Sequence, residues 1–214
     1  MPGITLYGQY DSPFVRRVAV VLYTYSKPFD HVPLSPFEDF EEIIKISPLG
    51  IVPVVKLSNG EALFDSGAII DFLDCLMSPN QRLTPAENPG RHRVMLYEAV
   101  ALGVLDKVTA LRTERYRKHS AAKDLNWESR TLRQIRGGLT WLEGRIGQGW
   151  FLHKEKSMAD VTTAILITHL RHRFPEALRA GYPGLEGLCD RCEKRPEFRA
   201  ATPLIGHARA SGER

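Results

Sequence analysis

The stretch Tyr7–Leu22, YGQYDSPFVRRVAVVL, contains the change from strand to helix that decides the fold of the N-terminal half. Just upstream, Ile4 and Leu6 alternate with Thr5 and Tyr7, which is the period of a strand. After Ser12 the apolar residues recur at the spacing of a helix face: Val15, Val18, Ala19 and Leu22. We therefore predict a strand that ends near Tyr7 and a helix that begins after Ser12.

Ser12 and Pro13 stand at the mouth of this predicted helix. Serine is a favoured N-cap residue, and proline at the first helical position loses no hydrogen bond, so capping alone explains the pair. A hydroxyl at this point also faces the carboxyl ends of the strands, where the helix dipole favours an anion. A thiol bound there would have a lowered pKa. No G-x-S-x-G elbow surrounds Ser12, so we do not expect it to act as a nucleophile.

The pattern of the next fifty residues completes an α/β domain. Residues 29–34 predict a second strand, so the chain opens with a βαβ unit. Residues 36–46 have weak helical character. Residues 52–57 and 61–64 predict a β-hairpin across the turn Ser58-Asn59-Gly60, and a helix follows Asp65-Ser66.

Two short segments of this domain have both a structural and a functional interpretation. Pro53 lies in a predicted strand, where it indicates either an edge position or a cis Val52-Pro53 bond. A cis bond would leave the backbone groups of Val52 open to an extended peptide ligand. Asp65 and Ser66 suit an N-cap, and they also suit a site that grips an α-amino acid head group.

The C-terminal half is predicted to be all helical. Residues 79–90 concentrate proline and polar side chains and indicate a linker between a domain at 1–78 and a domain at 91–214. Helical apolar faces then recur from Val94 to Val108 and from Leu132 to Ile146. Ser157 and Asp160 form a capping-box pattern before a strongly apolar helix.

Composition excludes several classes of protein. The 214 residues carry a net charge of only +4, which argues against a nucleic acid partner. No apolar run is long enough to span a membrane, and Met1-Pro2-Gly3 starts no export signal, so a cytoplasmic location is expected. Cys189 and Cys192 have redox spacing far from any βαβ pattern, and His169 with His172 are expected to be exposed helical histidines rather than metal ligands.

Four motifs in this order resemble the cytosolic glutathione S-transferase family, in a serine-type, bacterial-like form. They are SPFVRRV, SPLGIVPVV, FDSGAIIDFL and SMADVTTAIL, and the resemblance extends from about Ile4 to Thr202. It implies a thioredoxin-like N-terminal domain, an all-α C-terminal domain, glutathione as cosubstrate without a metal, and a homodimer.

The resemblance also implies roles for single residues. Ser12 matches the residue that contacts the glutathione sulfur, and Val52 before Pro53 matches the residue whose backbone pairs with the cysteinyl part. Asp65 and Ser66 match the residues that hold the γ-glutamyl end. Ser157 and Asp160 match the family's structural capping box.

Three positions leave details of the site open. Ile51 stands where many relatives carry lysine, so the glycyl carboxylate is held elsewhere, by Lys45 or by no residue. Tyr7 lies near the position of a catalytic tyrosine in other classes, but Ser12 is preferred because it lies at the helix mouth. Asp11 would oppose a thiolate unless Arg16 or Arg17 offsets its charge.

From these features we predict a detoxification enzyme that activates the glutathione thiolate for attack on a small electrophile. The electrophile would occupy an apolar pocket shared with the helical domain. One alternative is a glutathione-binding or interaction module with little turnover. Another is a glutathione-dependent isomerase or reductase, although serine in place of cysteine at position 12 argues against the reductase.

Overall fold

A four-stranded mixed sheet organises the N-terminal half of the computed structural model, which describes residues 3–116, 125–147, 149–152 and 155–203. The strands are β1 (Ile4–Tyr7), β2 (Asp30–Val32), β3 (Val54–Leu57) and β4 (Ala62–Phe64), in the order β2-β1-β3-β4. β1 runs parallel to β2 and antiparallel to β3, which pairs antiparallel with β4. The predicted hairpin is confirmed, and its turn contains Gly60 at a φ of +90°.

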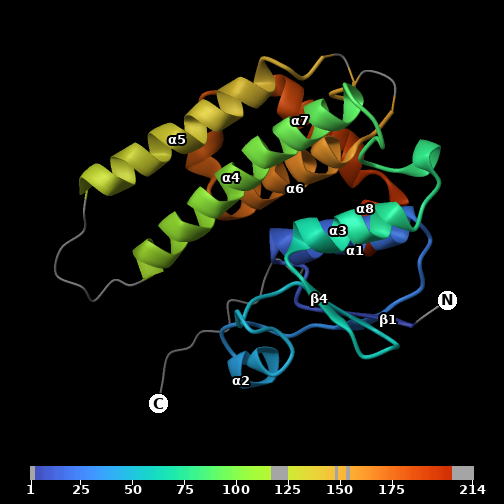
Figure 1. Ribbon diagram of the computed structural model, residues 1–214. Coiled ribbons are helices and arrows are strands. Elements are labelled where there is room, and N and C mark those ends of the chain that lie inside the picture. Colours follow the sequence, from blue (N-terminus) through green and yellow to red (C-terminus); the bar gives the residue numbers. More distant parts are fainter. Residues whose placement is uncertain (1–2, 117–124, 148, 153–154, 204–214) are drawn as a thin grey trace. The chain divides into compact units, whose positions relative to one another are not determined.

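Helices cover both faces of this sheet. α1 (Pro13–Thr24) and α3 (Ser66–Cys75) lie on one face, and the short α2 (Phe40–Ile44) lies on the other (Figure 1). The apolar face predicted for α1 is fully buried, since Val15, Val18, Ala19 and Leu22 have no exposed surface. The thioredoxin-like α/β architecture predicted for the N-terminal half is therefore confirmed.

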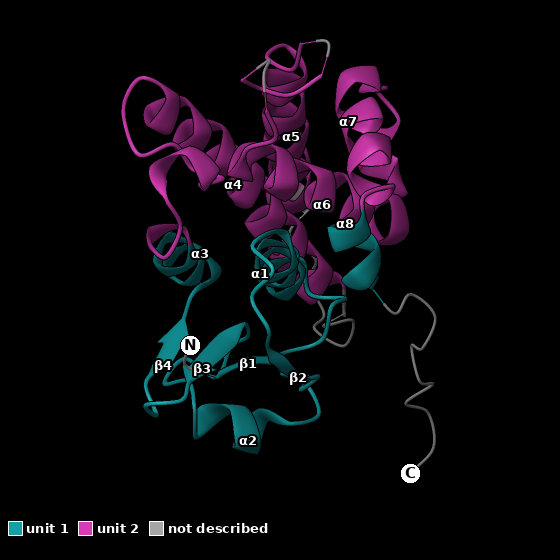
Figure 2. Ribbon diagram, turned by 90° about the vertical axis from the view of Figure 1, so that its right-hand side faces the viewer, with its two compact units in different colours: residues 1–73, 196–214 teal, residues 74–195 magenta. Residues whose placement is uncertain are grey.

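Two compact units make up the chain: unit 1 is residues 1–73 with 196–214, and unit 2 is residues 74–195 (Figure 2). α8 (Pro196–Ala200) packs on α1 and so belongs with unit 1. Arg16 of α1 makes this contact: its buried guanidinium donates from Nε to the carbonyl of Ala201 at 2.8 Å. The domain boundaries that we predicted at 78 and 91 stay a prediction.

The regular secondary structure in the described residues of unit 2 is all helical, as predicted. Its elements are η1 (Pro79–Gln81), α4 (Gly90–Tyr116), α5 (Leu125–Glu143), α6 (Met158–Arg173), η2 (Pro175–Leu178) and α7 (Pro183–Glu193). α6 packs against α4 and α7, and α4 also packs against α5. Almost every residue of the first three turns of α6 is buried, which makes this helix the core of the unit.

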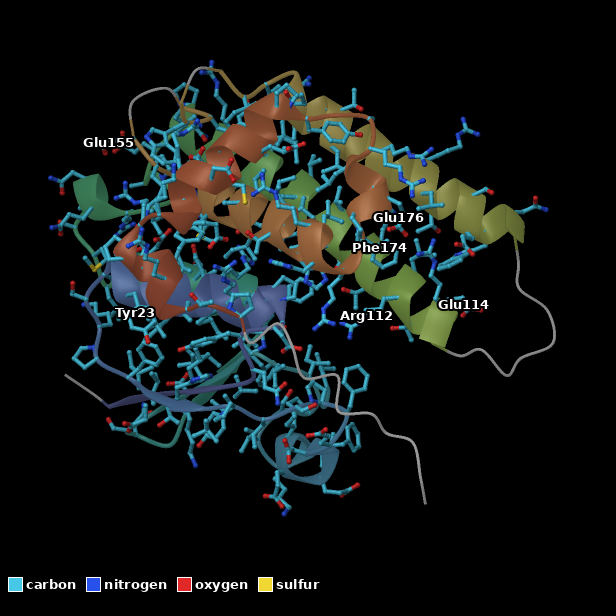
Figure 3. The ribbon with its side chains drawn as sticks, turned by 180° about the vertical axis from the view of Figure 1, so that it is seen from behind. Tyr23, Arg112, Glu114, Glu155, Phe174 and Glu176 are labelled. Carbon is cyan, nitrogen blue, oxygen red and sulfur yellow. The ribbon has the colours of Figure 1, made fainter. Side chains whose placement is uncertain are left out.

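Arg115 of α4 joins three elements of unit 2. Its guanidinium pairs with Glu128 of α5 at 2.8 Å and with Glu176 of η2 at 2.7 Å. It also lies over the ring of Phe174, 4.7 Å from the centroid, and Figure 3 shows Phe174 and Glu176 next to each other beside α4. Shared ion pairs of this kind raise the pKa of Arg115, although burial opposes the effect.

A helix that crosses a bilayer must be both long and strongly apolar. Within the described part of the chain, every helix falls short of that requirement.

Candidate functional site

Ser12 caps the first helix of unit 1. Its backbone is extended, Pro13 occupies the first helical position, and the Val15 N–H donates to its Oγ across 3.5 Å. That distance is long for an N–H to oxygen hydrogen bond, and the side chain is half-buried. Because Oγ acts as an acceptor in this contact, its own O–H is left to donate to a neighbouring anion.

The Val52-Pro53 peptide bond is cis, which answers the alternative that the sequence left open for Pro53. The antiparallel ladder of β3 begins at Val54, opposite Tyr7 of β1 and Phe64 of β4. Val52 therefore precedes the paired part of the strand, on the side from which β1 continues toward Ser12. Its side chain is nearly buried.

Gly8 lets the first turn of α1 and Val52 approach each other closely. It has a φ of +124°, and a Cβ at this position would lie 2.5 Å from Cγ2 of Val15 and 2.9 Å from Cβ of Val52. Only glycine avoids both the unfavourable backbone angle and the overlap. The side chains of Val15, in the first turn of α1, and of Val52, before Pro53, therefore both lie close to Gly8 at the end of β1.

A stacked pair of rings supports the backbone of Gly8. Nε2 of His31 in β2 donates a hydrogen bond to the Gly8 carbonyl at 2.7 Å, and the ring of Tyr10 stacks on His31 with centroids 4.1 Å apart. Burial, followed by the influence of the neighbouring Tyr23 side chain, raises the pKa of the Tyr10 hydroxyl. Sequence reasoning missed this pair, because the contact joins positions that share no periodic pattern.

Asp65 and Ser66 stand at the start of α3, where Asp65 makes the N-cap hydrogen bonds that the sequence predicted, and the binding of an α-amino acid head group stays a prediction. Asp65 has a φ of +70°, and its Oδ1 accepts hydrogen bonds from the N–H groups of Gly67 at 2.8 Å and Ala68 at 3.1 Å. The exposed aspartate is thus an N-cap. A positive φ at a non-glycine residue is costly and tends to mark a functional position. Ser66 is buried beneath it.

The two residues considered for the glycyl carboxylate, Ile51 and Lys45, are both exposed. Ile51 is 43% exposed, beside Val52. Lys45 is exposed, and its Nζ pairs with Glu42 one turn earlier at 2.7 Å. Phe40 covers Gly50, whose absent Cβ would lie 2.6 Å from the ring, so the surface next to Ile51 is apolar.

The basic residues that could offset Asp11 have other contacts. Arg16 holds α8, as described above. Arg17 is fully buried, and its Nη1 donates to Oγ of Ser66 at 2.8 Å. No sequence pattern predicts this contact, which joins α1 to α3.

Ser157 and Asp160 form a closed capping box at the start of α6. Oδ2 of Asp160 accepts hydrogen bonds from Ser157 N–H at 2.8 Å and Ser157 Oγ at 2.6 Å, and Oδ1 accepts one from Phe151 N–H at 2.9 Å. Burial raises the pKa of the Asp160 carboxyl, and these hydrogen bonds oppose the rise. The pair shapes unit 2 and lies far along the chain from the residues of the site.

The remaining candidates from the sequence have the features of core residues. Cys189 and Cys192 are buried on α7, and burial raises the pKa of the Cys192 thiol to about 12, so neither is a reactive thiolate. His169 is half-buried on α6, which corrects the expectation that it is exposed, and burial with the nearby Arg112 lowers its pKa to about 4. No metal-binding group of histidine, cysteine and acidic residues occurs among the described residues.

Comparison with curated proteins finds relatives along most of the chain. An uncharacterized GST-like protein of Escherichia coli K12, YibF, is 30% identical over 171 residues, which cover 78% of this chain and 82% of YibF. The maleylacetoacetate isomerase of Pseudomonas aeruginosa is 27% identical over 207 residues, or 92% of this chain and 95% of the isomerase.

Solved structures agree with the fold and carry glutathione ligands. A glutathione S-transferase of Methylobacterium radiotolerans in complex with glutathione sulfonate has a TM-score of 0.88 at 28% identity, over 99% of both chains. A second, from Methylobacillus flagellatus with GSH bound, has a TM-score of 0.86 at 27% identity, over 94% of this chain and all of that one.

Both halves of the sequence also match domain families. Residues 6–81 match the glutathione S-transferase N-terminal domain, and residues 105–200 match the glutathione S-transferase C-terminal domain. Since these matches span most of its length, the chain belongs to the glutathione S-transferase family.

Proposed function

We propose that this protein is a glutathione transferase that binds glutathione along unit 1 and ionises its thiol beside Ser12. The cysteinyl backbone would pair with Val52, and the γ-glutamyl end would lie at Asp65 and Ser66. The observation that supports the proposal is that the end of β1, the first turn of α1 and Val52 lie close together at Gly8. The glutathione ligands of related structures support the same ligand here.

The proposed chemistry follows from the position of the hydroxyl. Ser12 O–H donates to the sulfur, and the amino end of α1 favours negative charge, so both lower the pKa of the bound thiol. The thiol proton leaves to solvent, the thiolate attacks an electrophilic carbon, and a carbon–sulfur bond forms as the leaving group departs with its electron pair. Stabilising the anion in this way should raise the rate of the transfer reaction about 10²-fold.

Replacement of Ser12 by alanine tests this role. We expect turnover with a chloronitrobenzene to fall by about 10², because the anion loses a positioned donor. Ser58→Ala, in the exposed hairpin turn, is the matched control and should leave turnover unchanged. If Ser12→Ala and Tyr7→Phe both retain turnover within about twofold, neither hydroxyl activates the thiol and the mechanism is wrong.

An isomerase is the second candidate, favoured by the likeness to the maleylacetoacetate isomerase of P. aeruginosa over nearly the whole chain. In that case the thiolate would add to the substrate and be expelled again, so glutathione would be needed but not consumed. Assays that follow both glutathione consumption and substrate isomerisation separate the two. Binding of glutathione in calorimetry without either reaction would favour a binding module instead.

A homodimer completes the proposal. Four large apolar side chains among the described residues of unit 2 are exposed in the single chain: Leu76, Met95, Leu96 and Trp127. Exposed apolar side chains of this kind suit burial against a second copy. Sedimentation at micromolar concentration should give a mass near twice 24.1 kDa, and a monomer at all concentrations would refute this part.

A further inference from the structure

Arg17 is a fully buried arginine whose contact lies in the proposed glutathione site. It belongs to the second turn of α1, and its Nη1 donates to the Ser66 hydroxyl at 2.8 Å. Ser66 is the first residue of α3 and is also buried, and the proposed function places the γ-glutamyl end of glutathione at Asp65 and Ser66. A charged side chain is almost never fully buried unless it is paired, so the partners of Arg17 matter.

This hydrogen bond fixes the direction of the Ser66 hydroxyl. A guanidinium can only donate, so the serine oxygen must be the acceptor. The serine proton therefore points away from Arg17, toward any acceptor at the start of α3. Hydrogen bonds that carry a formal charge are stronger than neutral ones, so a donor polarised by Arg17 should hold a carboxylate more firmly than an ordinary serine does.

Asp65 places a negative charge beside Ser66 at the start of α3. Its Oδ1 is occupied by the N–H groups of Gly67 and Ala68, while the carboxylate as a whole is exposed. The start of α3 thus presents an exposed anion beside a hydroxyl with a cation behind it. That pairing is complementary to an α-amino acid head group, with its ammonium and carboxylate.

We propose that Arg17 is a positioning residue that acts through Ser66 and makes this site selective for ligands with a free α-carboxylate at the γ-glutamyl end. The inference rests on the proposed function, because it assumes that glutathione is the ligand. It predicts that the charge of the ligand's carboxylate, rather than its shape, determines affinity at this end.

Calorimetry with two probes tests it: glutathione, and a glutathione analogue whose γ-glutamyl α-carboxylate is a primary amide. The unaltered protein should bind glutathione at least about tenfold more tightly than the amide. Arg17→Met should lower the affinity for glutathione about tenfold and change the affinity for the amide little, so the preference for glutathione disappears. Arg17→Lys should recover part of it, and Arg133→Met, an exposed arginine on α5, should change neither affinity.

A double-mutant cycle separates positioning from a general effect on folding. If Arg17 acts through Ser66, adding Arg17→Met to Ser66→Ala should weaken glutathione binding by less than about twofold. An additive loss would overturn the proposal. Should the Arg17 variants not fold, the unaltered protein and Ser66→Ala still decide: equal affinity for both probes in the unaltered protein, or an undiminished preference in Ser66→Ala, refutes it. Failure to bind glutathione at all would instead refute the proposed function.

Discussion

Ser12 and Ser157 are both serine N-caps, but their surroundings differ in nearly every respect. Ser12 is half-buried, and its Oγ accepts one long hydrogen bond of 3.5 Å from its own helix. Ser157 is almost completely buried, and its N–H and Oγ both donate to Asp160, at 2.8 Å and 2.6 Å. The hydroxyl of Ser12 can still donate a hydrogen bond to a ligand, whereas both donors of Ser157 are used in hydrogen bonds to Asp160.

The difference shows that the identity of a capping residue does not assign its role. Both serines satisfy the sequence rule for an N-cap equally well. What separates them is the residue three positions on, which is Val15 after Ser12 and Asp160 after Ser157. An acid at that position accepts the donors of the serine, whereas an apolar residue does not. We call Ser12 the open cap and Ser157 with Asp160 the closed cap. The open cap should therefore matter for chemistry and the closed cap for stability.

The largest effect is expected from breaking the closed cap. Asp160→Ala removes the acceptor of buried donors on Phe151 and Ser157, which should lower the free energy of unfolding by about 4 kcal/mol. Asp160→Asn keeps an acceptor and should cost about half as much. Urea unfolding measures both. A loss below about 1 kcal/mol for the alanine variant would show that the box is dispensable.

The next effect concerns His169, a half-buried residue near the other end of the same helix. His169 has a pKa lowered to about 4, mainly by burial, against about 6.5 in an unfolded chain. The unfolded state then binds more protons between these values, so stability is complete above pH 6.5 and falls as the pH drops. The loss between pH 7 and pH 4 should approach about 3 kcal/mol.

Unfolding curves across this pH range check the prediction. His169→Gln should remove this part of the pH dependence, while His92→Gln, an exposed histidine of α4, should leave it in place. If the free energy of unfolding of both variants depends on pH as strongly as that of the unaltered protein, His169 is not the source of the pH dependence.

A smaller effect is expected from distorting the open cap. Gly8→Ala places a Cβ against Val15 and Val52 at a positive φ, so it should push the first turn of α1 away from Val52. We expect glutathione affinity to fall about tenfold. Gly60→Ala is the matched control, since Gly60 also has a positive φ but open space around it. Equal affinity losses in the two variants would mean that backbone strain, and not the convergence at Gly8, is responsible.

The smallest effect is expected at the glycyl end of the ligand. Lys45 is exposed and paired with Glu42, so Lys45→Ala should change glutathione affinity by less than about twofold. Ile51→Lys would restore a cation where many relatives carry one and should tighten binding a few fold. Calorimetry on both variants tests the point. A large loss in Lys45→Ala would assign the carboxylate to Lys45 after all.

The sequence predicted the parts of this molecule that depend on local pattern. The alternation around Ile4 and Leu6, the helical spacing after Ser12 and the Asn59-Gly60 turn each correspond to an element of the sheet domain. The cis Val52-Pro53 bond was one of two interpretations, because a proline in a strand pattern has few other solutions.

Contacts between distant positions were beyond such reasoning. Arg17 meets Ser66 across 49 positions, and His31 meets Gly8 across 23, so neither produces a periodic signal. The packing of α8 on α1 through Arg16 was missed for the same reason, since it joins the two ends of the chain. Sequence patterns locate the segments of the site, and tertiary packing supplies the residues that hold them.

The pKa of the glutathione thiol bound to the protein tests the central claim most directly. Following thiolate absorbance against pH should give a bound thiol pKa at least about one unit below the free value of about 8.5, and Ser12→Ala should return most of that shift. Ser58→Ala should leave it in place. A bound thiol that titrates like the free one, or a lowered pKa that survives the loss of Ser12, would contradict the account.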